Sequence, residues 1–599
     1  MGEAPPEPAP SDLERLAARF VAVWSYRFLG SRVVRLALLA VLASLCLVRT
    51  YIGLSGITDY SHDAFGALDG AWRVLNGQTP HADFYTPLGP LIYLVTAFGL
   101  LVSRGGAEGA GYSQALCGVL LGVWSYRLSR HRLGHLPAML LCLSVVLLSI
   151  NPSSVGEPPL RTSCMAYNRY GYALVTLLLV EGAAGRNPAG RRTEFWGGVS
   201  SGAILALLLF LKISYFVGGA ALVAALIPCR KQVKERWAGM AGGFLPVSLI
   251  FCAYLGFNLV PMWNDLRMVA GAKPVRISWF IVDNLYLPVA FYLGFIFASA
   301  RFLWSGGARP AARAIGIAGV AVCLAGIFLL STNFQFYGLP LNAMAAILVL
   351  QQIAAHPTGV LNRFGGTTNG QHIPRGKPWD RQPVSGKLRR KLGVSPGFAA
   401  HFWPAPPKRL STPPTASSRK MKHAGLLLWG SLLVAGDLGY EALGLGFGAW
   451  GRHTWEETAN ASFHAANLAG FRSFEAGYVD LVNDGLALVN QHRRADDTVM
   501  SLDFSNPFSY ALGMRPAPGG AITLHYRGNF TDAHHPAPER LFGGASLVMI
   551  PVVPTEKGLA RSIPRIYGPY LEEHFYAIGE STGWRIYRHR PEADKQHAF

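Results

Sequence analysis

The chain has 599 residues, of which 51% are hydrophobic and only 15% are charged. Water-soluble globular proteins carry about 25% charged residues, so this composition excludes an ordinary soluble enzyme. The formal net charge is +20, but the basic residues gather at the ends of apolar segments, as they do at the cytoplasmic ends of membrane helices. We therefore predict a membrane protein and no nucleic-acid partner.

The N-terminal segment 1–32 is rich in proline and then basic, and we predict that it is a cytoplasmic tail. The first apolar run, 33–53, is followed by no small-residue cleavage site, which indicates an uncleaved membrane anchor. An external loop is predicted over 54–110. Its apolar part, 88–102, is shorter than the roughly 17–25 residues that a membrane span needs, and this length predicts an interfacial or re-entrant helix.

Ten further apolar runs complete a predicted transmembrane core, 33–354, and a last span. With eleven crossings and a cytoplasmic N-terminus, the basic connections 126–132, 185–192 and 229–236 all lie in the cytoplasm, which agrees with the positive-inside rule. This agreement is the main support for the predicted topology. The runs are 111–128, 136–151, 168–184, 196–212, 214–228, 239–259, 278–300, 312–331, 338–354 and 424–441.

The connection 355–423 carries 13 lysines and arginines against the single acid Asp380. It is rich in proline, glycine and serine without periodicity, so we predict a disordered cytoplasmic loop. The span 424–441 then returns the chain to the outside.

Charges of both signs return in segment 442–599, and its apolar runs become short. Segments 497–504 and 545–553 have the pattern of buried strands, 481–494 that of a helix and 583–590 that of a closing strand. The predicted fold class is an α-helical polytopic membrane protein with about eleven transmembrane helices and a C-terminal soluble α/β domain, placed in the periplasm.

The seven cysteines indicate neither disulfides nor a metal site. All but Cys164 lie in apolar runs or at their edges, and none follows Cys323. No cysteine or histidine spacing is typical of metal ligands, so we predict no cofactor. The sequence leaves open whether a metal ion takes part.

The external loop 54–110 concentrates acidic residues, and these are the first candidates for chemistry. Asp59 and Asp63 are four residues apart and would share one face of a helix. Two neighbouring carboxylates favour proton abstraction or cation binding. The alternative is a solvated loop in which Asp59 and Asp83 cap helices.

The stretch HDAFGALDGAWRVLNGQTPHADFYTPLGPLIY, at 62–93, resembles the first external loop of the glycosyltransferase-C superfamily, in particular its bacterial mannosyl- and aminoarabinose-transferase-like members. These multi-span enzymes use polyprenyl-phosphate sugars. The matching features are Asp63, Ala71–Trp72, Gly77, Pro80, Asp83–Phe84, and Pro87 to Pro90 with Tyr93.

The resemblance implies that Asp63 is the catalytic base, with Asp59 as the second candidate. The chain departs from the oligosaccharyltransferase pattern because it has no external DxD or WWD motif. A metal-dependent oligosaccharyltransferase is therefore not implied.

Substrate-binding candidates lie in several external segments. Lys212 interrupts an apolar run near the external end of a span, where an ionisable residue is costly; related transferases carry a comparable lysine that contacts the donor phosphate. Arg169 is on the side that positive-inside statistics disfavour, and the guanidinium fork suits phosphate. Both side chains have an alternative, in which they reach from a helix end to the interface. The remaining candidates are His62, Asp83, Tyr85, Arg161, Tyr167 and Gln335.

These features predict an inverting glycosyltransferase that moves a sugar from a polyprenyl-phosphate donor to a saccharide, lipid or protein acceptor. The reaction is placed at the periplasmic face of a bacterial inner membrane, with membrane lipid as a further partner. A transporter or flippase is the alternative, and it requires polar groups near the bilayer midplane and broken helices. A third reading is a catalytically silent scaffold whose C-terminal domain binds a partner.

Overall fold

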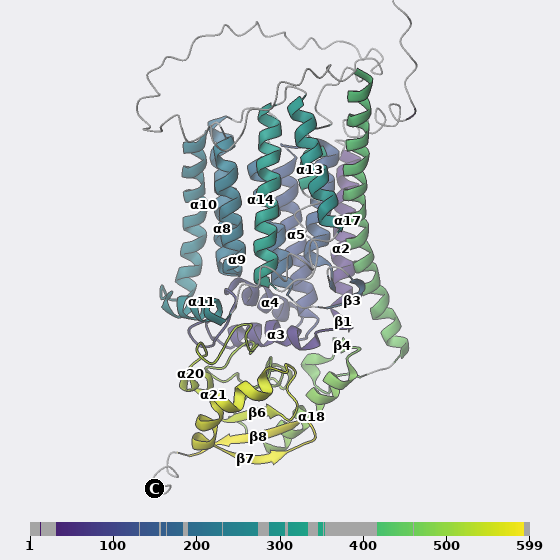
Figure 1. Cartoon of the computed structure of the whole chain (residues 1–599). Coiled ribbons are helices and arrows are strands. Elements are labelled where there is room, and N and C mark those ends of the chain that lie inside the picture. The colour runs from purple at the N-terminus through teal and green to yellow at the C-terminus, as the bar shows by residue number, and fades with distance from the viewer. Residues whose placement is uncertain are drawn as a thin grey trace, which may run out of the picture.

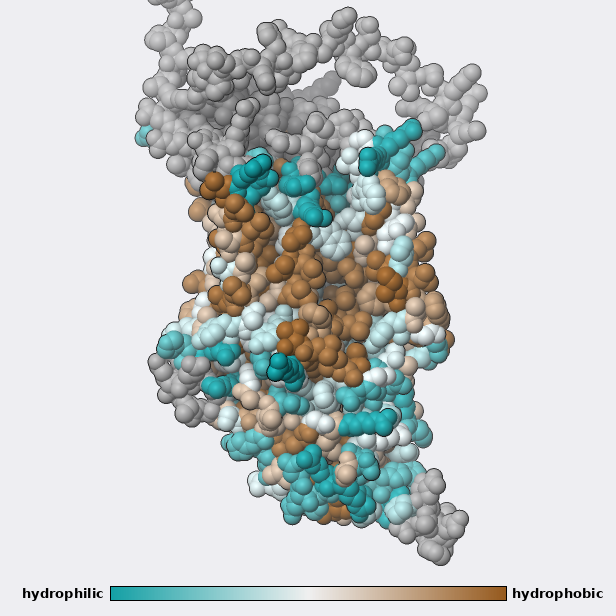
Figure 2. All heavy atoms as spheres, turned by 180° about the vertical axis from the view of Figure 1, so that it is seen from behind, coloured by the Kyte–Doolittle hydropathy of each residue, from teal (hydrophilic) through white to brown (hydrophobic). Residues whose placement is uncertain are grey.

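The computed structural model describes residues 12, 32–130, 132–154, 157–162, 165–183, 190–230, 232–272, 287–305, 309–333, 345–350, 353, 416–458 and 461–591. Long helices stand side by side in one layer of the molecule, and a smaller unit of strands and short helices lies at one end of them (Figure 1). On the face seen in Figure 2, hydrophobic residues form a broad belt over the long helices, with hydrophilic residues along both edges of the belt. This distribution is that of a membrane protein.

The apolar helices follow the predicted spans closely. In the described part of the chain, four are long and apolar enough to cross a membrane: Arg32–Ile52, Arg191–Leu211, Val233–Tyr254 and Gly425–His453. The total of eleven crossings and their direction stay predictions. The bounds are α2 Arg32–Ile52, α5 Gly109–Ser129, α6 His135–Ile150, α7 Ala166–Ala183, α8 Arg191–Leu211, α9 Ile213–Leu226, α10 Val233–Tyr254, α13 Leu287–Ser305, α14 Arg309–Asn333 and α17 Ala416–Thr458.

Helix α17 is longer at both ends than the span predicted over 424–441. It begins at Ala416, inside the segment predicted to be a disordered loop, and ends at Thr458. The first turns carry alanine, arginine, lysine and methionine, which favour helix, and they follow Pro414, after which no proline interrupts the helix. Hydropathy marks only the apolar part of such a helix, so the prediction missed its polar ends.

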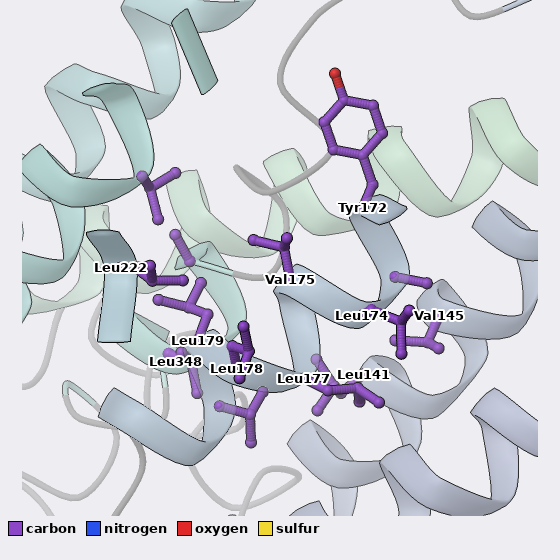
Figure 3. Packing of buried hydrophobic residues seen from close by; sticks show 14 of the residues in the cluster. Leu141, Val145, Tyr172, Leu174, Val175, Leu177, Leu178, Leu179, Leu222 and Leu348 are labelled. Atoms are coloured by element: carbon purple, nitrogen blue, oxygen red, sulfur yellow. The ribbon is translucent and has the colours of Figure 1, made fainter. Parts of the chain in front are cut away.

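The main core of the helical layer lies where α6, α7 and α9 meet. Leucines and valines of α7 are buried on all sides, against Leu141 and Val145 of α6 and Leu222 of α9 (Figure 3). A helix that is apolar around its whole circumference is buried, which places α7 at the centre of this layer.

Basic residues of the predicted cytoplasmic connections form buried ion pairs at the end of the helices opposite the strands. Arg236 of α10 lies 3.3 Å from Glu181 of α7 and 3.2 Å from Glu194 of α8. Arg132 and Arg230 join the same two carboxylates. A charge buried in this way needs its partner, so these arginines hold the three helices together in addition to any effect on topology.

The smaller unit contains a four-stranded sheet with the order β5-β6-β8-β7. Strand β5 pairs parallel to β6, and the other pairs are antiparallel. The bounds are β5 Val499–Ser501, β6 Leu547–Pro551, β7 Phe575–Glu580 and β8 Trp584–His589, with helices α18 Ala476–His492, α19 Phe508–Ala511, α20 Pro538–Phe542 and α21 Leu559–His574 around them.

Segment 54–110, the predicted first external loop, packs against this smaller unit. Its strand β1 (Leu54–Ile57) pairs in parallel with β4 (Phe471–Ser473), and helix α3 (Ser61–Leu75) packs between α4 (Leu91–Val102) and the sheet unit. Phe65 and Leu68 of α3 are fully buried in one cluster with Val482 of α18 and Trp584 of β8. Segments more than 400 residues apart in sequence thus share one core.

Candidate active site between the helices and the C-terminal unit

Asp63 lies in the first turn of helix α3, which begins directly after a residue with a left-handed backbone conformation. Tyr60 has a φ of 57°, in the left-handed region, and its carbonyl oxygen accepts a hydrogen bond of 3.1 Å from the Asp63 backbone nitrogen. The helix begins at Ser61, so Asp59 precedes it and the predicted shared helix face of Asp59 and Asp63 is wrong. The Asp59 carboxylate instead accepts a hydrogen bond from the Tyr60 backbone nitrogen, a local contact of the kind expected in a loop.

Lys212 separates α8 from α9 in an extended conformation, with φ −165° and ψ 126°. The charge that interrupts the apolar run in the sequence thus lies at a break between two helices in the structure. Its ammonium group lies 4.7 Å from the centroid of the Tyr167 ring, a distance at which the ring face attracts a cation.

Gly89 brings the proline-rich entry to α4 against this break. The Gly89 backbone nitrogen donates to the Leu211 carbonyl oxygen at 3.0 Å, and a Cβ atom at position 89 would collide with the Phe210 carbonyl. Only glycine allows this approach. Pro87 and Leu88 consequently lie beside Lys212.

Asp63, Tyr167 and Lys212 line a single cavity with a volume of about 160 Å³. Among its described lining residues, Asp63 is the one carboxylate and Lys212 is the one ammonium group. The C-terminal unit closes the other side with Phe504, Thr523, His525 and Asn529. The cavity thus places the carboxylate of α3 and the ammonium group at the break between α8 and α9 beneath residues of the C-terminal unit.

Asn529 shapes the loop that forms this cover. Its side-chain nitrogen donates to the Thr523 carbonyl oxygen at 2.8 Å, and its side-chain oxygen accepts from the His525 backbone nitrogen at 2.8 Å. The Tyr85 hydroxyl donates to the Asn529 carbonyl oxygen at 2.6 Å. Tyr85, which was predicted to bind substrate, is fully buried and fixes the loop that lines the cavity.

Asp265, in helix α11 (Val260–Ala272), joins three segments around the cavity. Its fully buried carboxylate lies 2.9 Å from His81 Nδ1 and 2.6 Å from Arg540 Nη1. It also accepts a hydrogen bond of 3.2 Å from the Thr86 backbone nitrogen. The Thr86 hydroxyl in turn lies 2.6 Å from that of Tyr93, whose ring lines the cavity.

The other predicted residues that the structure describes are not among the lining residues of this cavity. The His62 ring packs edge-on against Phe504 at 4.7 Å between centroids. The exposed Asp83 carboxylate accepts a hydrogen bond from the Thr79 backbone nitrogen. The His62 ring thus contacts the C-terminal unit, whereas the Asp83 carboxylate supports the local turn of the loop.

Arg161 contacts helix α17, and Arg169 interacts electrostatically with a residue of the same helix. Arg161 donates to the Phe447 carbonyl oxygen at 3.1 Å, and burial lowers the pKa of its guanidinium group. Arg169 is buried in α7 and interacts electrostatically with Glu441. Gln335 lies outside the described residues.

The sequence reading missed the contribution of the C-terminal unit and the Asp265 contacts. No motif marks Asp265, His81 and Arg540, because residues this far apart in the chain meet only in the folded structure. Asp69 and Arg73 did carry a signal: they are spaced i,i+4 on α3 and form a buried ion pair of 2.8 Å, a spacing that brings such side chains together.

Asp503 precedes Phe504 of the cavity wall, and we predict that its carboxyl group makes the stability of the folded protein depend on pH. Burial raises the pKa of this carboxyl group above the ordinary value of 3.8, although Thr555 donates two hydrogen bonds to it. The folded protein therefore keeps the proton to higher pH than the unfolded chain. The protonated Asp503 carboxyl group therefore contributes to the free energy of unfolding at pH values below its ordinary pKa. This contribution is lost as the pH rises through the pKa of the folded state.

Asp503→Asn keeps a neutral, isosteric side chain, so we expect it to flatten this part of the dependence of melting temperature on pH. Thermal unfolding of the purified protein across acidic pH measures the slope. Asp496→Asn, at an exposed position, is the control. A wild-type slope in Asp503→Asn contradicts the prediction.

Comparisons with known proteins found little sequence similarity and a distant structural one. No family model matches the chain, and no curated protein matches it. Among solved structures, the chain is similar to ArnT from Cupriavidus metallidurans bound to undecaprenyl phosphate, with 13% identity, 92% of this chain and 98% of that chain covered, and a TM-score of 0.43. The apo state of the same protein gives 14% identity, the same coverage and a TM-score of 0.48.

Proposed function

We propose that the protein is an inverting membrane glycosyltransferase that moves one sugar from a polyprenyl-phosphate donor to an acceptor at the periplasmic face of the inner membrane. The observation that carries this proposal is the cavity shared by Asp63 and Lys212. A carboxylate and a cation in one cavity are what such a transfer requires, one to receive a proton and the other to stabilise a phosphate.

In the proposed reaction, a hydroxyl oxygen of the acceptor attacks the anomeric carbon of the sugar from the face opposite the phosphate. Asp63 takes the hydroxyl proton, as a general base does. The bond between the anomeric carbon and the phosphate oxygen breaks, and its electron pair stays on the phosphate. Configuration at the anomeric carbon is inverted, and polyprenyl phosphate is the leaving group.

Lys212 is suited to stabilise the charge that develops on that phosphate. Its ammonium group is at the break between α8 and α9 and is oriented by the Tyr167 ring. A preorganised cation directed at developing negative charge supplies a large part of catalysis in many enzymes. No metal is needed for either step as proposed.

The size of the cavity agrees with transfer of a single sugar. Its volume of about 160 Å³ is below the roughly 300–1,000 Å³ of pockets that enclose whole ligands. A sugar ring can occupy it only if the lipid chain stays outside, in the bilayer next to α4 and α8.

Lys212→Ala is expected to weaken use of the donor more than use of the acceptor, because it removes the charge facing the donor phosphate. Loss of one such donor costs about 10²–10³-fold in rate, and we expect a loss of this order in kcat/KM for the donor. Initial rates at varied donor and fixed acceptor measure it. Lys234→Ala, exposed on α10, is the charge-matched control. An unchanged donor dependence in Lys212→Ala assigns Lys212 to the interface instead.

The function itself is tested with the purified full-length protein, a panel of labelled polyprenyl-phosphate sugars and envelope extracts as acceptors. Turnover of one donor, with inversion at the anomeric carbon, supports the proposal and identifies the sugar. If no donor is turned over and none binds, the proposal is wrong. The transporter alternative then gains support if the protein moves a lipid-linked sugar across vesicle membranes.

A further inference from the structure

A second cavity lies far from the active site, in a groove between α2 and α5. Its volume is about 800 Å³. The walls are leucines and valines, among them Leu39, Leu42 and Val119, and the floor includes Val146 of α6. Gly122 of α5 has no side chain to cover Val146, whose Cγ2 atom would lie 2.6 Å from a Cβ at that position.

Four arginines line this groove, and all of them come from the same end of it. Arg32 and Arg35 are in the first turn of α2, whereas Arg127 and Arg130 are at the end of α5, which runs in the opposite direction. All four side chains are exposed, and the residues described along the rest of the groove are mostly apolar. The groove is therefore strongly basic at one end and apolar along the rest of its length.

We infer that this groove binds an anionic phospholipid of the leaflet opposite the C-terminal unit, with the phosphate at the four arginines and an acyl chain along the apolar walls. Arginine recognises phosphate through its planar fork, and four exposed guanidinium groups at one end of the groove provide positive charge for an anionic head group. Tyr126, at the same end, is of the type enriched at membrane interfaces.

The length of the groove suits one leaflet. It extends along α2 from Arg32 to Cys46, which is roughly 20 Å at 1.5 Å per residue. Half of a typical hydrocarbon core is about 15 Å thick. One acyl chain can therefore lie in the groove while its head group stays at the interface.

The same geometry distinguishes this lipid from the proposed donor. The donor must place its phosphate at the cavity next to Lys212, at the other end of the helices, where the C-terminal unit lies (Figure 1). The arginine cluster is at the opposite end. The groove is thus a separate site, and the inference does not depend on the proposed function.

The test is native mass spectrometry of the full-length protein, stripped of lipid in detergent, with phosphatidylglycerol and with phosphatidylcholine of identical acyl chains. We expect preferential binding of phosphatidylglycerol. The double variant Arg32→Gln/Arg127→Gln should weaken this binding by roughly fivefold per arginine removed. Ala43→Trp, which fills the apolar groove from an exposed position, should weaken binding of both lipids.

The matched control is Arg192→Gln/Lys234→Gln, which removes two exposed charges from the same end of α8 and α10 and should leave phosphatidylglycerol binding unchanged. Equal affinity for the two lipids overturns the inference. An equal loss in the control, or normal binding by Ala43→Trp, does so as well.

Discussion

Replacing Asp63 by asparagine is expected to lower the rate of sugar transfer by about 10²–10⁴-fold, the usual contribution of a general base. The amide has nearly the same shape as the carboxylate but cannot take the acceptor proton. Asp63 is half-buried in the first turn of α3, and asparagine keeps both the shape of the side chain and the backbone hydrogen bond to Tyr60. Stability should therefore change little, and donor binding should persist.

The measurement is single-turnover transfer from a labelled donor, with donor binding and melting temperature recorded on the same preparation. Asp59→Asn is the matched control, because Asp59 lies four residues earlier in the same loop but outside the cavity lining. We expect it to have a much smaller effect. Full activity in Asp63→Asn, or the larger loss in Asp59→Asn, would show that the base has been misassigned.

Replacing Asp265 by alanine is expected to destabilise the contact between the helices and the C-terminal unit. The change removes a fully buried carboxylate from His81, Arg540 and the Thr86 backbone nitrogen together. Breaking a buried ion pair by deleting one partner costs about 3–5 kcal/mol. Because Thr86 also contacts Tyr93 in the cavity wall, activity should fall as well.

Thermal unfolding in detergent measures this effect. Limited proteolysis reports whether the contact between α11 and the C-terminal unit has opened, because an opened contact exposes both segments to cleavage. Asp532→Ala provides the comparison, since Asp532 forms an exposed ion pair with Arg565 in the C-terminal unit and such pairs contribute little. Asp265→Asn, which keeps the shape and one acceptor, should recover part of the stability. If Asp265→Ala and Asp532→Ala behave alike, the three contacts of Asp265 do not hold the unit in place.

Neighbouring residues determined the parts of the fold that the sequence predicted well. Each apolar run becomes a helix because lipid offers the backbone no hydrogen-bonding partner. The hydrogen bonds that satisfy the backbone therefore form between residues of the same run. Hydropathy therefore located α2 and α5 to α10 closely, and it located the apolar part of α17. The helix ends were less accurate, because the polar ends of α17 obey helix propensity and capping.

Single residues of the site were predicted where local chemistry or the resemblance marked them. Asp63 stood out in a loop that resembles a known family, and Lys212 stood out as a charge within an apolar run. The pairing of Asp59 with Asp63 failed because a left-handed residue, Tyr60, starts the helix after Asp59. Sequence spacing gives a shared face only when both residues lie in the same helix.

By itself, the sequence determined the membrane class, the positions of most helices and the two charged residues on which the proposed chemistry depends. Only the tertiary structure decided that Asp63, Tyr167 and Lys212 line one cavity, that the loop around Asn529 covers it and that Asp265 holds the parts together. Helix formation is a local property of the chain and leaves a trace in composition. Contacts between residues hundreds of positions apart depend on how complementary surfaces pack, and no periodicity in the sequence records them.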